Sequence, residues 1–184
     1  PIRIGREDTL DGTTTSYNVV SDNTISRYGA DLPSIGMGIV VGVTTNCRVS
    51  HNQINDGSFM GIQLGRNTSS AMTCGNNILE YNHIFNVQLI HDDSGVLYST
   101  GQQTGSVYRY NLVHGVPQGA IIYPDDYTSG ITFEKNLIYD CYWGALIRGA
   151  SATIQNNIFA SFKNPAHGYV YYSSNGANVQ HNIF

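Results

Sequence analysis

A six-residue pattern recurs seven times along this chain of 184 residues. Each copy contains an apolar residue, two variable residues, an Asn, one variable residue and a second apolar residue. The copies are Val20/Asn23/Ile25, Val49/Asn52/Ile54, Leu79/Asn82/Ile84, Tyr108/Asn111/Val113, Phe133/Asn136/Ile138, Ile154/Asn157/Phe159 and Val179/Asn182/Phe184. Successive Asn residues are 21 to 30 positions apart. A period of this size, without a failed copy, indicates a stacked repeat protein.

A second element, a Gly followed by a short apolar strand, comes after each of the first six Asn residues. These predicted strands cover 38–41, 61–64, 95–98, 119–122, 144–147 and 168–171, and 2–5 has the same character. No helical period lies between the two elements, and the 20 Gly residues supply turns. Short strands separated by turns, repeated every two to three dozen residues, are the size of one β-helical coil.

The two elements together predict an all-β fold, a right-handed parallel β-helix of about seven coils. One coil cannot cover its own apolar face, whereas coils stacked about 4.8 Å apart pair every strand and form a continuous core. Equivalent positions then line up in columns. We therefore expect the repeated Asn residues to form an internal amide ladder, with a structural role.

The chain is expected to form a single domain over residues 1–184. Pro1 enters in mid-coil and Phe184 stops in mid-coil, so the sequence predicts that one or both end caps are lacking. Either the chain is a fragment of a longer β-helix, which we favour, or it self-associates end to end.

Composition narrows the possible partners. Only 12% of residues are charged and the net charge is −4, which argues against nucleic acid, and no apolar run is long enough for a membrane helix. Three cysteines cannot all pair. Cys47 and Cys74 fall in adjacent coils, so one disulfide is conceivable, and Cys141 is expected to be a buried thiol.

Part of the chain, residues 90–159, resembles a known group of proteins. The matching segments are Asp-Ser-Gly-Val-Leu-Tyr at 93–98, Tyr-Asn-Leu-Val-His at 110–114, Ile-Tyr-Pro-Asp-Asp at 122–126, Ser-Gly at 129–130 and Asn-Asn-Ile-Phe at 156–159. They resemble secreted bacterial right-handed β-helix proteins that act on carbohydrate. Some of these are glycoside hydrolases of the fucosidase and xylanase types, in which two aspartates supply the acid and the nucleophile or base.

The resemblance implies an extracellular or periplasmic location and a polysaccharide or oligosaccharide partner. The chain departs from the group's pattern at two positions. Arg148 stands where a His often precedes Gly, and Gly115 stands where an Asp usually follows the His of the anchor. These departures weaken the transfer of activity but leave the fold untouched.

Acidic residues are few, and their grouping predicts the site. Asp93 precedes one strand, while Asp125 and Asp126 follow the equivalent strand of the next coil. We take these three aspartates as the candidate catalytic residues of a glycoside hydrolase, with Asp93 paired with Asp125 or Asp126, because such an enzyme needs one protonated and one ionised carboxyl group. The candidate substrate-binding residues on the same or the adjacent coil are His91, Tyr98, His114, Tyr123 and Arg148.

One geometric objection accompanies this hypothesis. In glycosidases the two catalytic carboxyl groups lie about 5.5 to 9.5 Å apart. If the residues between Asp93 and Asp126 are all extended, the separation of their carboxyl groups is well beyond this range. They approach only if the aspartate segments fold back as turns. Pro124 and Gly130 permit such a bend.

Three alternatives stay open from the sequence. In the first alternative, the aspartates have only a structural role in turns, where Asp is favoured. Alternatively, Asp92, Asp93 and Asp125 bind Ca²⁺ in a polysaccharide lyase, with Arg148 as the nearby cation; otherwise we expect no cofactor. Zinc is not expected, because the six His residues lack ligand spacing. Finally, the chain is a non-catalytic β-helix, either an adhesin or a filament-forming stack.

Overall fold

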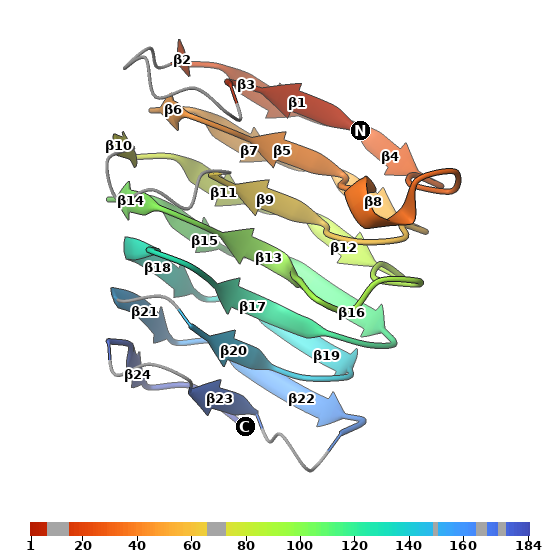
Figure 1. The fold of residues 1–184 in the computed structure, drawn as a ribbon. Helices are drawn as coiled ribbons and strands as arrows, with labels where there is room; N and C mark the ends of the chain where they lie inside the picture. Colours follow the sequence, from red (N-terminus) through yellow and green to blue (C-terminus); the bar gives the residue numbers. More distant parts are fainter. Residues whose placement is uncertain (7–14, 66–72, 149–150, 165–168, 173–175) are drawn as a thin grey trace.

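The fold is a stack of short strands connected by tight turns (Figure 1). The computed structural model describes residues 1–6, 15–65, 73–148, 151–164, 169–172 and 176–184. Within these ranges the one helical element is a 3₁₀ turn, η1 (Pro33–Ile35). None of the helical structure in this part of the chain is long or apolar enough to cross a membrane.

Three parallel sheets run along the stack. The first has the order β1 (Ile2–Ile4), β5 (Ile39–Val41), β9 (Ile62–Leu64), β13 (Gly95–Ser99), β17 (Ala120–Pro124), β20 (Ala145–Ile147) and β23 (Val170–Tyr172). The second contains β2 (Thr15–Ser16), β3 (Val19–Ser21), β6 (Thr44–Thr45), β7 (Arg48–Ser50), β10 (Thr73–Gly75), β11 (Ile78–Glu80), β14 (Gln102–Thr104), β15 (Val107–Arg109), β18 (Ser129–Glu134), β21 (Ser151–Gln155) and β24 (Asn178–Gln180). The third contains β4 (Thr24–Ser26), β8 (Gln53–Asn55), β12 (His83–Phe85), β16 (Leu112–Val116), β19 (Leu137–Cys141) and β22 (Ile158–Phe162).

These sheets confirm the predicted parallel β-helix and its seven coils. Each Gly-apolar segment of the sequence contributes one strand to the first sheet, which has seven strands among the described residues. The Gly of the last copy, Gly168, lies outside the described residues. Every strand pairs with its equivalent one coil away, as stacking requires.

The Asn ladder forms as predicted, at the corner between the second and third sheets. Each Asn donates from its Nδ2 to the Oδ1 of the Asn in the next coil, at 2.9 to 3.0 Å, from Asn23 to Asn182. The same Oδ1 accepts the backbone N–H of the preceding Asn. The side chain therefore replaces the backbone partners that the turn removes.

The residue before each ladder Asn has a positive φ, as at Tyr81 and Tyr110, both at 54°. This left-handed conformation turns the chain from one sheet to the next, at a cost of about 1 kcal/mol for a residue with a side chain. The side chains project outward and stack: Tyr81 and Tyr110 lie 5.1 Å apart between ring centroids with planes 8° from parallel. Lys135 of the next coil lies over the Tyr110 ring.

The core is one continuous column of apolar side chains. Both apolar residues of the repeat point inward, and Leu79, Tyr108 and Phe133 are fully buried one above another. The Tyr108 and Phe133 rings stack with planes 3° from parallel. The Tyr108 hydroxyl donates to the carbonyl of Tyr98 at 2.9 Å, so its polar tip is satisfied inside the core.

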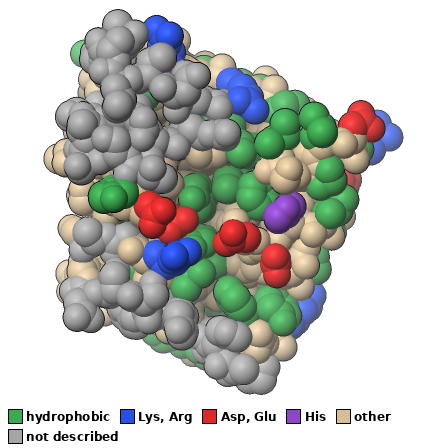
Figure 2. Space-filling model, viewed as in Figure 1, with side chains coloured by type: hydrophobic (Ala, Val, Ile, Leu, Met, Phe, Trp, Pro, Cys, Tyr) green, Lys and Arg blue, Asp and Glu red, His purple; other side chains and the backbone are tan. Residues whose placement is uncertain are grey.

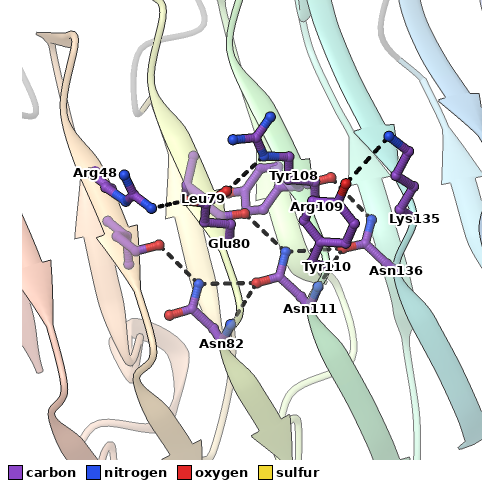
Figure 3. A network of polar contacts seen from close by, with 11 residues as sticks. Arg48, Leu79, Glu80, Asn82, Tyr108, Arg109, Tyr110, Asn111, Lys135 and Asn136 are labelled. Carbon is purple, nitrogen blue, oxygen red and sulfur yellow. Dashed lines mark hydrogen bonds and ion pairs between the residues drawn. The ribbon is translucent and has the colours of Figure 1, made fainter.

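A buried charge ties three strands of the second sheet together (Figure 3). Glu80 in β11 is 1% exposed and forms ion pairs with Arg48 of β7 and with Arg109 of β15, the latter at 2.7 Å. The two guanidinium groups reach Glu80 from the coils on either side. A buried carboxylate needs such compensation, and the repeat pattern did not predict this network.

The conceivable disulfide is excluded, because Cys47, Cys74 and Cys141 are all free. In the second sheet Gly75 pairs with Thr45. Cys74 therefore lies level with Thr44 and not with Cys47. The two cysteines are three residues out of register. The expectation that Cys141 is a buried thiol is confirmed, and burial raises its pKa to about 12.

Candidate functional site

The first sheet carries a column of outward-pointing side chains that defines the site. The register aligns Val40 with Gln63, Gln63 with Tyr98, and Tyr98 with Tyr123, one coil after another. Alternation along each strand sends the neighbours of these residues into the core and these residues outward. Figure 2 views this face and shows acidic groups, a basic group and a histidine scattered among hydrophobic side chains.

Tyr98 and Tyr123 form the centre of the column. Their rings make an edge-to-face contact with centroids 5.4 Å apart. Burial, followed by the hydrogen bond to Asp125, raises the pKa of Tyr98 well above its ordinary value. Burial also raises the pKa of Tyr123, against the opposing effect of Arg148. Both phenols are therefore protonated at neutral pH, and Tyr98 acts as a hydrogen-bond donor.

Asp125 follows β17 directly and is held in place from two sides. Its Oδ2 accepts the Tyr98 hydroxyl at 2.8 Å, and its Oδ1 lies 3.9 Å from Nε of Arg148. The side chain is 13% exposed, whereas that of Arg148 is 52% exposed. Oδ1 is buried and accepts no hydrogen bond from the described residues. Asp125 is therefore oriented by the Tyr98 phenol and faces the Arg148 guanidinium.

Asp126 comes next in the same turn and is exposed. The turn closes with a hydrogen bond from Thr128 N–H to the Asp125 carbonyl at 2.9 Å, and it is fastened to the preceding coil. There Asp125 N–H donates to the Ser99 carbonyl, and Gly101 N–H donates to the Asp126 carbonyl. The negative charge of Asp126 acts on Tyr98 and Arg148, so its carboxyl group faces the same cluster as Asp125.

Arg148 closes the cluster from the following coil. Its Nη1 donates to the Tyr123 hydroxyl at 3.2 Å. This hydrogen bond, together with the charges of Tyr123 and then Asp125, raises the pKa of the guanidinium. Tyr98, Tyr123, Asp125, Asp126 and Arg148 therefore gather as the sequence predicted for neighbouring coils.

Asp93 lies at the opposite end of the column. Gly95 pairs with Ala120, so the backbone at Asp93 is a full strand, Ala120–Pro124, away from Asp125. Five extended residues span roughly 16 Å. The charge of Asp93 still acts on Tyr123, which lies between them. The turn at Asp125–Asp126 does not fold back along the strand to Asp93, so the register lends no support to the predicted pairing of Asp93 with Asp125 or Asp126.

The two histidines lie apart from this cluster. His91 packs its ring on Phe59, with centroids 5.1 Å apart, and its backbone N–H donates to the Ser58 carbonyl. His114 is in β16 of the third sheet. There its Nε2 lies 2.9 Å from Nε2 of His83, and its ring stacks on Tyr139. The assignment to adjacent coils was sound, but a coil has three faces, and His114 is on another one.

The sequence did not single out the residues that wall the column beside Tyr98. Met37, Phe59 and Met60 cover Val40 and contact Tyr98. Gln63 and Thr100, 3% and 4% exposed, are buried polar residues of the same region. The available signal was the strand 61–64, Gly-Ile-Gln-Leu, which places an amide at an outward position between apolar residues.

The donor set for a metal ion is poor. The described residues contain no group of three or more His, Cys, Asp or Glu side chains that is arranged to hold one. The alternative with Ca²⁺ on Asp92, Asp93 and Asp125 therefore gains no support from side-chain geometry, because the column separates Asp92 and Asp93 from Asp125.

Comparison with known proteins identifies the family. The family described as right handed beta helix region matches residues 5–126. The chain belongs to this family. The match agrees with the three parallel sheets and supplies the right-handed sense of the coil. It covers the Asp125–Asp126 turn.

A solved structure with the same fold is a GH136 lacto-N-biosidase from Eubacterium ramulus. The two chains superpose with a TM-score of 0.56 at 18% sequence identity, over 89% of this chain and 28% of that chain. At this identity the similarity shows the fold alone. This β-helix chain spans under a third of the length of the neighbour. Comparison with curated proteins gives no significant match.

Proposed function

We propose that this β-helix hydrolyses glycosidic bonds of a polysaccharide or oligosaccharide, with Asp125 and Asp126 as the paired carboxyl groups. The observation that carries the proposal is the placement of Asp125. Tyr98 donates to one of its oxygens, Arg148 faces the other, and the exposed Asp126 follows it in the same turn, beside the partly exposed Tyr98. The lacto-N-biosidase with the same fold adds support by its own name.

The two aspartates take different roles because their surroundings differ. Asp126 is exposed in the free chain; a bound sugar would cover it and favour its protonated form, and it would then donate this proton to the glycosidic oxygen as the bond to the anomeric carbon breaks. Asp125, mostly buried between Tyr98 and Arg148, would serve as the charged carboxylate. It would either take the proton of an attacking water or attack the anomeric carbon itself. The partly exposed Tyr98 would offer its ring to the sugar, and the buried Tyr123 would support that ring from the next coil.

Such substrates lie outside the cell, so we propose an extracellular or periplasmic location in a bacterium. Asp93, at the far end of the column, would contact a more distant part of the glycan. Because this role is binding and not catalysis, substitution of Asp93 should reduce activity less than substitution of Asp125 or Asp126.

The first prediction concerns activity. The 184-residue chain is incubated with a panel of plant and bacterial glycans, and released reducing ends are measured. Asp125→Asn and Asp126→Asn should each lower kcat by about 10²-fold or more, because general acid and base groups contribute that much. Asp93→Asn should cost about tenfold or less, mainly in KM.

The matched control is Asp22→Asn, which removes an exposed carboxylate at a corner of the second and third sheets. It should leave the rate unchanged. Equal rates in the parent, Asp125→Asn and Asp126→Asn would refute the catalytic pair. Failure of the parent to cleave any glycan of the panel would favour a non-catalytic β-helix.

A further inference from the structure

A hollow of about 210 Å³ lies beside Tyr98, towards the coil before it. Its lining combines apolar and polar side chains: Ser34, Ile35, Met37, Met60, Gln63, Tyr98 and Thr100. Gln63 is the residue aligned with Tyr98 one coil earlier, about 4.8 Å away along the stack. Tyr98 connects the hollow with the Asp125 cluster, because it lines the hollow and its hydroxyl donates to Asp125.

Two buried polar atoms in this lining have no hydrogen-bond partner among the described residues. They are Oε1 of Gln63 and Oγ1 of Thr100. The Gln63 amide is oriented, because its Nε2 donates to the Gly65 carbonyl at 2.9 Å, and this leaves Oε1 as a fixed acceptor. Buried polar groups are almost always paired in folded proteins, and an unpaired one costs about 1 to 3 kcal/mol. A ligand with a hydroxyl or amide N–H would supply the missing partner.

The lining also indicates the charge of the ligand. Among the described residues, the side chains that line the hollow carry no charge: they are aliphatic, thioether, amide, hydroxyl and phenol groups. The carboxyl groups of Asp125 and Asp126 act on Tyr98 from the adjoining coil. Arg148, the cation of that cluster, already faces Asp125 and donates to Tyr123, so an anionic sugar would find no cation among the described lining residues to pair with. A neutral sugar ring fits this lining, because its hydroxyl groups can donate to the unpaired oxygen atoms and its C–H groups can pack on the apolar side chains.

We propose that this hollow is a subsite that holds one neutral sugar unit, bearing hydroxyl or acetamido groups, of the glycan whose bond is broken at Asp125 and Asp126. The assignment rests on the proposed function and adds a substrate class to it. Gln63 accepts a hydrogen bond from the sugar, Thr100 exchanges one with it, and Met37 and Met60 pack on its apolar face. Uronic-acid polymers are excluded as occupants.

The test measures binding separately from catalysis. The inactive Asp126→Asn chain is applied to immobilised oligosaccharides of galactose, xylose and N-acetylglucosamine, with oligogalacturonates as the anionic comparison. Neutral probes should bind and oligogalacturonates should not. Adding Thr100→Val should weaken the neutral probe about three- to tenfold, which is the worth of one hydrogen bond.

Thr100→Val is informative because it preserves shape and removes a hydroxyl that has no partner in the described residues. Its thermal midpoint should equal or exceed that of the parent. Thr24→Val, on the exposed face of the third sheet, is the matched control and should change neither binding nor stability.

The outcomes separate the two proposals. Binding of oligogalacturonates as tight as that of neutral probes, or neutral binding unaffected by Thr100→Val, overturns the subsite and leaves the catalytic pair untouched. Neutral binding that Thr100→Val weakens, together with a parent chain that cleaves none of these probes, upholds the subsite and refutes hydrolysis. Failure of every neutral probe to bind at millimolar concentration also overturns the subsite.

Discussion

At the scale of single residues, the ladder Asn is the side chain on which the coil depends most. Asn111 makes four kinds of contact: it donates to Asn136 and to the Leu79 carbonyl, and its Oδ1 accepts the side chain and the backbone N–H of Asn82. It is 1% exposed, so water cannot replace these partners. An amide is required, because the position needs a donor and an acceptor at once.

We predict that Asn111→Ala lowers the free energy of unfolding by about 3 kcal/mol, since it strands several buried polar groups at once. Urea denaturation measures this loss. Asn178→Ala, at an exposed position of β24, is the control and should cost about 0.5 kcal/mol or less. Equal effects of the two substitutions would contradict the structural role of the ladder.

At the scale of elements, the strands are short, and side-chain contacts between neighbouring strands add to the stability of the sheets. Glu80 joins β7, β11 and β15 through two arginines, and His83 and His114 join β12 and β16. A 2.9 Å separation of the two Nε2 atoms requires one ring to donate and the other to accept. The accepting ring is therefore neutral, and protonation of both breaks the contact.

This pair predicts a dependence of stability on pH. Burial, and then the charge of His83, lower the pKa of His114, while Asp140 opposes them. The unfolded chain thus binds more protons at His114 than the folded chain once the pH falls below about 6.5, so the folded state loses stability there. The urea midpoint should fall from pH 7.5 to pH 5 by less in His114→Gln than in the parent. Parallel midpoints in the two chains would contradict the coupling.

At the scale of the whole molecule, each coil contacts only its neighbours, so stability is distributed along the stack. In Figure 1 the first sheet runs from β1 to β23, and each of these outer strands pairs with one strand in that sheet, whereas β13 pairs with two. Local opening of an outer coil breaks one interface, and opening of a central coil breaks two.

We predict a gradient of amide hydrogen exchange along this chain. Amides of β11, β13 and β15 should exchange slowest, and those of β1 and β24 should exchange at least about tenfold faster, because one coil interface fewer is worth more than about 1.4 kcal/mol. Exchange followed by mass spectrometry or NMR measures the gradient. Uniform protection from one end to the other would show instead a single cooperative unit.

The sequence by itself determined the parallel β-helix, its seven coils and its Asn ladder. Each coil has an apolar face that it cannot cover alone, and stacking the coils buries this face. Stacking also places equivalent residues of successive coils above one another. The sequence also determined that Tyr98, Tyr123, Asp125, Asp126 and Arg148 fall on neighbouring coils, because the Gly-apolar strands fix that register.

Only the tertiary structure decided which face of the coil each side chain occupies and how far apart the groups lie along a strand. It placed His114 on the third sheet, separated Asp93 from Asp125 by a strand, kept Cys47 and Cys74 out of register, and folded the 33–37 segment over Val40 to make the hollow at Gln63. The reason is physical. The repeat specifies contacts that recur in every coil, whereas turns of unequal length between the strands differ in each coil, and they position the residues that do not repeat.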